Sequence, residues 1–302
     1  MIEADDLPLA RTLDVGGMKV HAVEAGIQWL DGGAMFGVVP RPLWEKKIEP
    51  DSRNRIPLAL RCLLVETSEN LVLVDTGIGN KESEKFRDIY GVDNEGDPTR
   101  LEDGLRSLGV EPDDVDLVVS THLHFDHAGG NTLQTREGAV RPAFPRARYV
   151  MQKGEVDFAD SPNERVQASY MAKNFRPLVE AGKVDLVEGA TELVRGVRLL
   201  PTPGHTPFHQ SVVLEGEGES AIFLADLCPT TAHLPLPWIM GYDLEPLVTL
   251  ETKRRLWETI RREEWIVLFQ HDARTPWGRL DPEEERPALL PLSRTASGPG
   301  EA

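Results

Sequence analysis

The chain of 302 residues is long enough to bury a substantial core, and its fractions of hydrophobic (40%) and charged (27%) residues are those of a globular protein. It carries 33 basic and 50 acidic side chains, a formal net charge of -17 at pH 7. This charge repels nucleic-acid phosphates and anionic lipid surfaces, so we expect neither as a partner.

The sequence also indicates where the protein resides. No stretch approaches the ~18 to 20 apolar residues that a membrane-spanning helix needs. The first residues lack the basic and apolar regions of a secretory signal. Two cysteines, Cys62 and Cys228, cannot form a disulfide framework and are expected to be buried and free. We therefore expect a cytoplasmic protein that does not contact membranes.

The first predicted strands lie at residues 18–30, 58–67 and 71–77, where apolar residues alternate or β-branched residues are common. The residues between the first two strands are rich in Gly and Pro and predict a long irregular loop, which in compact domains is usually functional or disordered. The large apolar side chains of this loop and its approach either line a pocket or cover the core as a hydrophobic strap: Trp29, Met35, Phe36 and Trp44.

A helix is expected at residues 99–108, a buried strand at 116–121, a short strand at 147–152 and a helical region at about 153–180. The helical region contains large side chains that either pack in the core or cap the same pocket: Phe158, Tyr170, Met171 and Phe175.

In the second half, the pattern predicts strands near 184–188, 197–202, 210–215 and 220–225, a helix at 245–263 and a strand at 265–270. Strands outnumber helices in both halves, which favours a layered α/β domain with two sheets. With no internal repeat and no long linker, residues 1–302 are expected to form a single domain. Its core would span about 18–275, and 276–302 would be an extended, partly disordered tail.

The stretch "STHLHFDHAGGN", residues 120–131, places three of the chain's eight histidines and an aspartate within six positions. On an extended chain, residues two apart point to the same side, so His122 and His124 can bind one metal ion. Asp126 and His127 follow where the chain must turn and can face a second ion. Imidazole and carboxylate ligands suit zinc and also accept iron, cobalt or manganese.

Three other predicted strands end at a residue that can bind metal. His205 lies in "TPGHTPFHQS", Asp226 ends "AIFLAD", and His271 follows "WIVLFQ". Each signal is weak alone, but ligand-type residues at four strand ends can gather at one edge of the sheets. Two histidines have no predicted partner: His21 and His209, of which His209 is a candidate to support a ligand.

These motifs, in this order and with these gaps, resemble the metallo-β-lactamase superfamily from about residue 20 to 275. The resemblance implies a four-layer αβ/βα sandwich with the site at the edge of the two central sheets. It also implies two divalent metal ions, most often Zn²⁺. One ion would be held by His122, His124 and His205 and the other by Asp126, His127 and His271, with Asp226 as the bridging ligand.

Departures from the superfamily's motifs narrow the choice among its branches. Zinc β-lactamases commonly use a cysteine ligand, so Cys228, two residues after Asp226, stays an alternative ligand. Di-iron flavoproteins carry a glutamate where this chain has His124, and they need a flavin domain for which 302 residues leave no room. RNA-processing members usually have basic surfaces. The motifs resemble most closely the N-acyl-homoserine lactonases and the related organophosphate hydrolases.

One residue of that branch is missing. Its lactonases typically have a tyrosine near the ligands that contacts the substrate carbonyl, but residues 227–232 contain none. His233 and Tyr242, slightly further along the chain, are the candidates to replace it as a catalytic donor.

The resemblance implies a hydrolase that opens neutral lactones or esters. A hydroxide between the two metal ions would attack the carbonyl carbon, and Asp126 would shuttle the proton. Organophosphate triester or general carboxylic ester hydrolysis at the same site is the alternative, and a mononuclear iron redox enzyme or a non-catalytic metal-binding protein is less favoured. The sequence contains no GxSxG motif or phosphate-binding loop, and it leaves open whether two copies form a homodimer.

Overall fold

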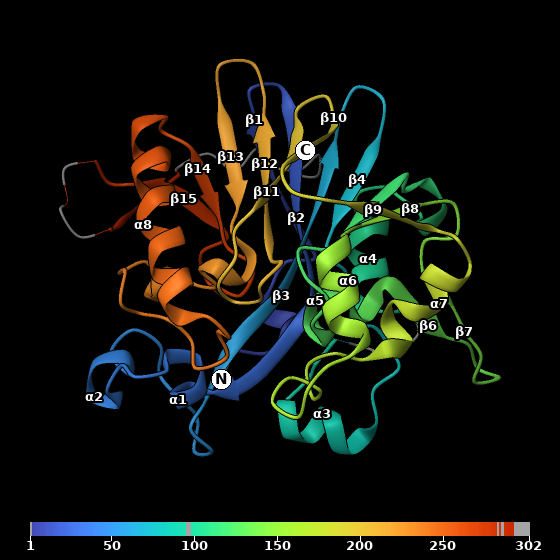
Figure 1. The fold of residues 1–302 in the computed structure, drawn as a ribbon, viewed down its shortest axis with the longest axis horizontal. Coiled ribbons are helices and arrows are strands. Elements are labelled where there is room, and N and C mark those ends of the chain that lie inside the picture. Colours follow the sequence, from blue (N-terminus) through green and yellow to red (C-terminus); the bar gives the residue numbers. More distant parts are fainter. Residues whose placement is uncertain (1, 95–97, 283, 285–286, 293–302) are drawn as a thin grey trace, which may run out of the picture.

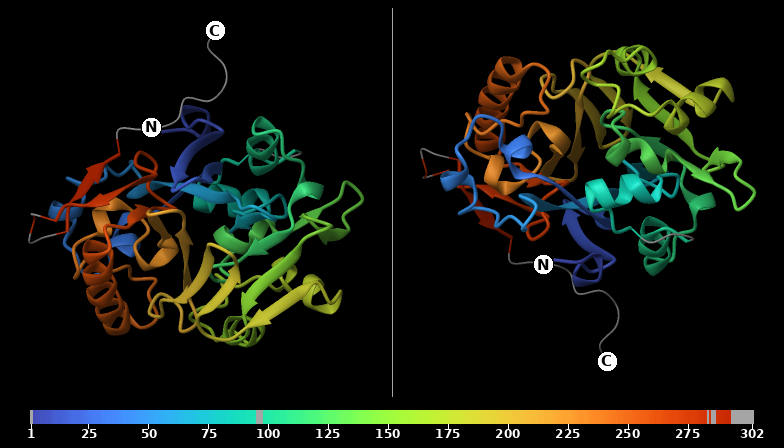
Figure 2. Two further views of the ribbon diagram at one scale, coloured as in Figure 1. Left: turned by 90° about the horizontal axis from the view of Figure 1, so that it is seen from above. Right: turned by 90° about the horizontal axis from the view of Figure 1, so that it is seen from below.

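The structure is a computed structural model that describes residues 2–94, 98–282, 284 and 287–292. Two seven-stranded sheets lie face to face, and helices cover their outer sides (Figure 1). Views from above and below show helix α8 on one side of the molecule and the helices of the first half on the other (Figure 2). The predicted αβ/βα sandwich is confirmed. Within the described residues, no helix is both long and apolar enough to cross a membrane.

The first sheet has the order β1-β2-β3-β4-β5-β8-β9 and the second the order β10-β11-β12-β13-β14-β15-β16. The strands of the first sheet are β1 Ala10–Val15, β2 Met18–Asp31, β3 Arg55–Glu66, β4 Leu71–Val74, β5 Leu117–Val119, β8 Arg148–Gln152 and β9 Val184–Val187. Those of the second are β10 Thr191–Val194, β11 Val197–Pro201, β12 Gln210–Glu215, β13 Ser220–Phe223, β14 Ile266–Leu268, β15 Trp277–Leu280 and β16 Leu289–Pro291. A separate hairpin contains β6 Thr132–Gln134 and β7 Val140–Pro142.

The α-helices are α1 Gly32–Phe36, α2 Arg41–Trp44, α3 Glu84–Tyr90, α4 Arg100–Ser107, α5 Phe125–Ala128, α6 Lys153–Asp160, α7 Arg176–Glu180 and α8 Pro246–Arg262. Short 3-10 helices are η1 Ala4–Asp6, η2 Pro112–Asp114, η3 Gly129–Asn131, η4 Ala172–Asn174, η5 Ala225–Leu227 and η6 Thr231–His233.

Local signals explain where the predicted helices begin. Helix α4 starts at a capping box, in which the Thr99 side chain accepts a hydrogen bond from the Glu102 N–H and the Glu102 carboxylate accepts one from the Thr99 N–H. Helix α8 begins at Pro246, whose fixed φ suits the first turn. One face of α8 is buried against the second sheet through Leu256 and Ile260, four residues apart.

Three apolar clusters account for the layers. The cluster between the two sheets contains inward-facing residues of both, such as Val65 of β3 and Phe223 of β13. A second cluster joins the first sheet to α4 and α6, and a third joins the second sheet to α8. Each sheet is therefore buried on both faces, which explains why β3, β4, β5 and β14 read as apolar runs.

Several predicted boundaries change. Strands β15 and β16 continue the second sheet beyond residue 275, where the core was expected to end. The prediction missed them because they are short, but β15 pairs with β14 and buries Trp277. Residues 293–302 of the predicted tail lie outside the described residues. The region 153–180 contains two short helices and one 3-10 turn, not a continuous helical segment.

The predicted loop after β2 contains helices α1 and α2. Its Phe36 and Trp44 are fully buried, and their rings stack at 5.3 Å. They form a small cluster of their own with Ile56 and Leu58 of β3. For these two residues, the alternative of a hydrophobic strap over the core is the one that the structure shows.

The backbone after the histidine-rich motif is held by a buried lysine. The side-chain amino group of Lys81 donates hydrogen bonds to the main-chain carbonyls of Gly129 and Thr132. Burial, and then the positive charge of Lys173, lower the pKa of Lys81 from its ordinary value of 10.5 to about 7.

This depressed pKa predicts how stability depends on pH. Between pH 7 and 10.5 the unfolded chain keeps the Lys81 proton while the folded chain has lost it, so the free energy of unfolding rises with pH. In denaturant titrations, the unfolding free energy of the wild type minus that of Lys81→Met should increase by about 1 kcal/mol per pH unit in this window, because methionine does not titrate. A difference that stays constant with pH would contradict this.

Candidate metal centre

The structure brings together all seven predicted metal ligands. They lie in turns or short helices that follow strands β5, β11, β13 and β14, at the same edge of the two sheets. The β13–β14 pair and the β4–β5–β8 strands are parallel, so their carboxyl ends meet at that edge. The seven side chains are His122, His124, Asp126, His127, His205, Asp226 and His271, all of them buried.

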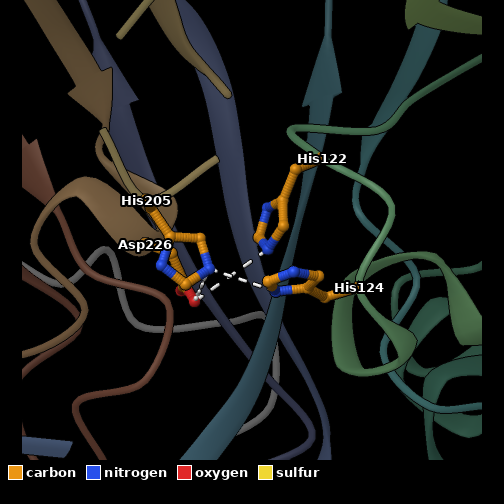
Figure 3. Close-up of side chains that lie close together, drawn as sticks. All are labelled: His122, His124, His205 and Asp226. Atoms are coloured by element: carbon orange, nitrogen blue, oxygen red, sulfur yellow. Dashed lines mark hydrogen bonds and ion pairs between the residues drawn. The ribbon is translucent and has the colours of Figure 1, made fainter. Parts of the chain in front are cut away.

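The first cluster contains His122, His124, His205 and Asp226, whose potential ligand atoms lie within 4.8 Å of one another (Figure 3). The Nε2 atom of His205 is 3.1 Å from Nδ1 of His124 and 3.2 Å from Oδ2 of Asp226. The Nε2 atom of His122 is 4.0 Å from the same oxygen. The three imidazoles and the carboxylate converge on one point.

The second cluster contains Asp126, His127 and His271, again within 4.8 Å of one another. The Nε2 atoms of His127 and His271 are 3.3 Å apart. They also lie 3.3 Å and 3.1 Å from Oδ1 of Asp226, the carboxylate oxygen that does not face the first cluster. Asp226 thus presents one oxygen to each cluster.

The hydrogen bonds around the site fit metal binding. His271 Nδ1 lies 2.7 Å from the Ala59 carbonyl oxygen, which only accepts, so Nδ1 carries the proton and Nε2 has a free lone pair. His127 Nδ1 lies 3.0 Å from Asp75, and His205 Nδ1 lies 3.0 Å from Asp243. Among the described residues, the buried His122 Nε2 and Asp226 Oδ1 have no hydrogen-bond partner. These unpaired atoms and fixed tautomers are what two cations at the clusters would require.

Asp75 organises two histidines at once, and the sequence analysis missed it. Its carboxylate accepts hydrogen bonds from His127 Nδ1 and from the Thr121 hydroxyl at 2.8 Å. The Thr121 oxygen can in turn accept a hydrogen bond from His122 Nδ1, 3.2 Å away. Asp75 directly follows the apolar strand β4, so the pattern used to find Asp226 could have found it. Asp243 and Gln28, which donates to Asp126, have no comparable signal.

The charges of the two clusters are coupled. Burial disfavours the charged form of His127, but the carboxylates of Asp226 and Asp126 raise its pKa well above the ordinary value. Burial similarly opposes ionisation of Asp226, yet the neighbouring histidines, His127 first, hold its pKa well below the usual range. In His122 and His124 burial dominates and lowers the pKa. Asp226 therefore stays ionised, and its negative charge makes the site favourable for binding cations.

Two sequence-based candidates find other roles. His233 is buried outside the pocket described below, with Nδ1 2.8 Å from the Thr230 hydroxyl and Nε2 2.8 Å from the Met35 carbonyl. Its ring stacks on Phe36, and no donor is left for a substrate, so the expectation of a catalytic role is corrected. The Cys228 thiol contacts the Thr230 carbonyl, and burial raises its pKa to about 12, which does not suit a thiolate ligand.

A pocket of about 390 Å³ opens over the two clusters. Its lining includes the ligands His124, Asp126, His205, Asp226 and His271. The remaining wall is mainly apolar and comprises Leu30, Ala34, Met35, Leu58, Tyr90, Phe125, Arg165, Val166, Ala168, Ser169, Met240, Gly241, Tyr242 and Leu244.

The large side chains expected at this pocket are only partly there. From the segment after β2, Met35 lines it, whereas Trp29, Phe36 and Trp44 do not. From the region 153–180, the wall is formed by Arg165, Val166, Ala168 and Ser169, while Tyr170 and Phe175 pack in the core. Tyr170 and Phe175 are therefore core residues and not part of the pocket wall.

Two tyrosines line this pocket from opposite halves of the chain. Tyr90 ends helix α3, and Tyr242 precedes Asp243, the partner of His205. Burial, and then the charge of Asp126, raise the pKa of Tyr90, while burial and then Tyr90 raise that of Tyr242. Within the described residues neither phenol makes a hydrogen bond in the structure. Both hydroxyls are therefore available to a ligand, although the sequence analysis named only Tyr242.

Comparisons with known proteins agree with this geometry. The sequence pattern of the metallo-beta-lactamase superfamily matches residues 56–271. An N-acyl homoserine lactonase from a Bacillus species is 32% identical over 228 residues, which cover 72% of this chain and 82% of that protein. The AiiA lactonase of Bacillus thuringiensis subsp. kurstaki is 33% identical over 225 residues, with coverages of 71% and 82%.

Solved structures are similar over most of the chain. A probable metal-dependent hydrolase from Staphylococcus aureus superposes with a TM-score of 0.85 at 32% identity, covering 94% of this chain and 100% of that one. An N-acyl homoserine lactone hydrolase with N-hexanoyl-L-homoserine at its catalytic metal centre gives a TM-score of 0.66 at 29% identity, covering 86% and 95%.

Proposed function

The chain belongs to the metallo-beta-lactamase superfamily, and on this basis we propose that it is a dinuclear metal-dependent hydrolase that opens lactones. The observation that carries the proposal is the position of Asp226, with one carboxylate oxygen facing each of two ligand clusters at the floor of an apolar pocket. The lactonases among its relatives support the choice of substrate.

We propose Zn²⁺ at both positions, with iron, cobalt or manganese as alternatives, because the donor sets consist of imidazoles and carboxylates. His122, His124 and His205 would hold one ion, and Asp126, His127 and His271 the other, with Asp226 shared. When bound, the two ions lower the pKa of a water molecule and polarise the substrate carbonyl.

Asp126 is the proposed proton carrier. It lies in the floor of the pocket, and its Oδ2 accepts a hydrogen bond from the Gln28 amide. In lactone opening, hydroxide adds to the acyl carbon, the bond from that carbon to the ring oxygen breaks, and the remaining proton of the water must reach the leaving alkoxide. The Asp126 carboxylate can take that proton and deliver it on the same side of the pocket.

The pocket favours a neutral substrate with an apolar chain. Leu30, Met35, Val166, Met240 and Leu244 offer apolar contacts. Among the described lining residues Arg165 is the one permanent cation, and it is exposed and donates to the Gly241 carbonyl. An N-acyl lactone fits this lining, whereas a phosphomonoester would enter a pocket in a protein of net charge -17 with little cationic support.

The other functions remain alternatives for the same site. A neutral organophosphate triester or a simple ester also suits an apolar pocket above two cations. A mononuclear iron redox enzyme is disfavoured because it has no use for the second cluster of Asp126, His127 and His271. We further propose a cytoplasmic location, because Cys62 and Cys228 are both free and buried. We also propose a single domain, because one apolar cluster joins the two sheets. A homodimer stays an open prediction.

The two pocket phenols are proposed to replace the tyrosine that the lactonase pattern has after Asp226. A hydrogen bond from Tyr242 or Tyr90 to a substrate carbonyl is worth about 1 kcal/mol. Steady-state kinetics should therefore show kcat/KM for an N-acyl lactone falling about 5- to 10-fold in Tyr242→Phe and in Tyr90→Phe.

The matched control is Tyr149→Phe, because the Tyr149 hydroxyl is bound to the main chain of Phe144 in the core. It should lower the melting temperature and leave kcat/KM unchanged. Unchanged kcat/KM in both pocket variants would remove the phenols from the mechanism.

A substrate panel tests the function itself. The purified, metal-loaded protein is given an N-acyl homoserine lactone, an alkyl lactone, an aryl ester and a phosphotriester, and the products are identified by mass spectrometry. We expect the hydroxy acid from the N-acyl lactone at the highest kcat/KM. Turnover of the triester without turnover of either lactone would transfer the proposal to the organophosphate alternative.

A further inference from the structure

His209 is a fully buried histidine with no role in the proposed hydrolysis. It belongs to the same turn as His205, and its ring lies 5.2 Å from that of His122 and 6.1 Å from that of His205. It is not among the groups whose ligand atoms converge on either cluster. Its position beside the clusters, without a place in them, calls for a separate explanation.

The hydrogen bonds of His209 determine which nitrogen carries its proton. Nε2 lies 3.2 Å from the main-chain nitrogen of Asp226, which only donates, so Nε2 must accept. Nδ1 lies 2.9 Å from the Thr202 hydroxyl oxygen and 3.1 Å from the Thr202 carbonyl oxygen; since Nε2 accepts, the proton of the neutral ring is on Nδ1, which can donate to either oxygen. His209 is thereby defined as a neutral imidazole with its proton on Nδ1.

His209 connects two turns that carry metal-ligand candidates. The Thr202 N–H donates to the His209 carbonyl at 2.9 Å, which closes the turn that contains His205. The imidazole then reaches across to the turn of Asp226. That second turn is strained, because Ala225 has a φ of 45°, in the left-handed region that a residue with a Cβ seldom adopts. An acceptor for the next N–H helps to hold this conformation.

We propose that His209 is a positioning residue: by accepting a hydrogen bond from the Asp226 N–H, it holds the strained turn in which the Asp226 carboxylate faces both clusters. The proposal rests on the proposed dinuclear site, but it concerns metal binding and does not depend on which substrate is hydrolysed. Support of this kind for a ligand typically changes metal affinity by about 10- to 100-fold.

Replacing His209 with glutamine or with asparagine tests its two hydrogen bonds one at a time. The glutamine side chain is long enough to put its amide oxygen near the position of Nε2, where it can accept from the Asp226 N–H. The asparagine side chain is shorter and puts its amide near Nδ1, where it can donate to the Thr202 carbonyl but cannot reach Asp226. His209→Gln and His209→Asn therefore form a matched pair, since each inserts one polar amide in place of a buried ring.

The test is a competitive titration of each variant with Zn²⁺ against a chelating indicator, alongside the melting temperature of the metal-free protein. We expect His209→Asn to bind the weaker of the two ions about 10- to 100-fold less tightly than wild type, and His209→Gln to stay within a few-fold of wild type. Equal losses of affinity in the two variants, or losses that only parallel their melting temperatures, would overturn the proposal.

A second measurement needs no variant. Two-dimensional ¹⁵N NMR of the histidines in the wild-type protein reports the tautomer of each ring. The proposal requires His209 to be neutral with its proton on Nδ1, and a proton on Nε2 would overturn it. Wild-type protein that binds two ions but opens no lactone would contradict the proposed substrate while leaving this test intact.

Discussion

Asp226→Asn is expected to reduce the bound metal from two ions per chain to at most one. The substitution keeps the size of the side chain but replaces one carboxylate oxygen with an amide nitrogen that cannot bind a cation. It also removes the negative charge that lies 3.1 to 3.3 Å from the histidines His205, His127 and His271. We expect kcat/KM for a lactone to fall by about 10³-fold or more, equivalent to about 4 kcal/mol of transition-state stabilisation. Metal analysis by mass spectrometry and steady-state kinetics on the same sample measure both effects.

Asp185→Asn is the matched control for this substitution. Asp185 lies on β9, an edge strand of the first sheet, and forms a half-exposed ion pair with Arg148, neither of which belongs to the clusters. The control should retain two ions and wild-type kcat/KM. If Asp226→Asn also retained two tightly bound ions, Asp226 could not be the shared ligand.

Asp126→Asn is expected to reduce kcat by about 10² to 10⁴-fold, the usual range for loss of a general acid–base group. The amide can still approach a cation through its oxygen, but it cannot take a proton from water and return it to the leaving alkoxide. Since the Asp126 carboxylate faces His127 and His271 at 3.8 and 3.7 Å, weaker binding of the second ion is also expected.

Measuring kcat at saturating metal separates these two effects. Excess Zn²⁺ should restore occupancy in Asp126→Asn without restoring kcat. Full recovery of kcat on addition of metal would show that Asp126 acts only as a ligand and that the proton travels by another route.

The ligand candidates were accessible from the sequence because each follows an apolar strand. His122 and His124 are two residues apart, so one short segment signals both. His205, Asp226 and His271 come from distant segments, and their meeting could be inferred only because parallel strands share an edge. Asp243 gave no signal, because its contact with His205 depends on a turn 38 residues along the chain.

The residues around the pocket were harder to predict. Phe36 and Trp44 are apolar residues in an irregular segment, a pattern that fits both a pocket wall and a core, and only packing against Ile56 distinguishes the two. Tyr90 lies at the end of a short helix far in sequence from every ligand motif. Its role in the pocket arises from tertiary structure alone. Strands β15 and β16 were missed for a similar reason, since the pairing of β15 with β14 and of β16 with β15 compensates for their short length.

Metal stoichiometry measured together with the products of lactone turnover tests the central claim most directly. The purified chain should contain two divalent ions, and it should convert an N-acyl homoserine lactone to the ring-opened hydroxy acid without consuming oxygen. A single iron per chain with oxygen consumption, and no ring opening, would contradict the dinuclear hydrolase.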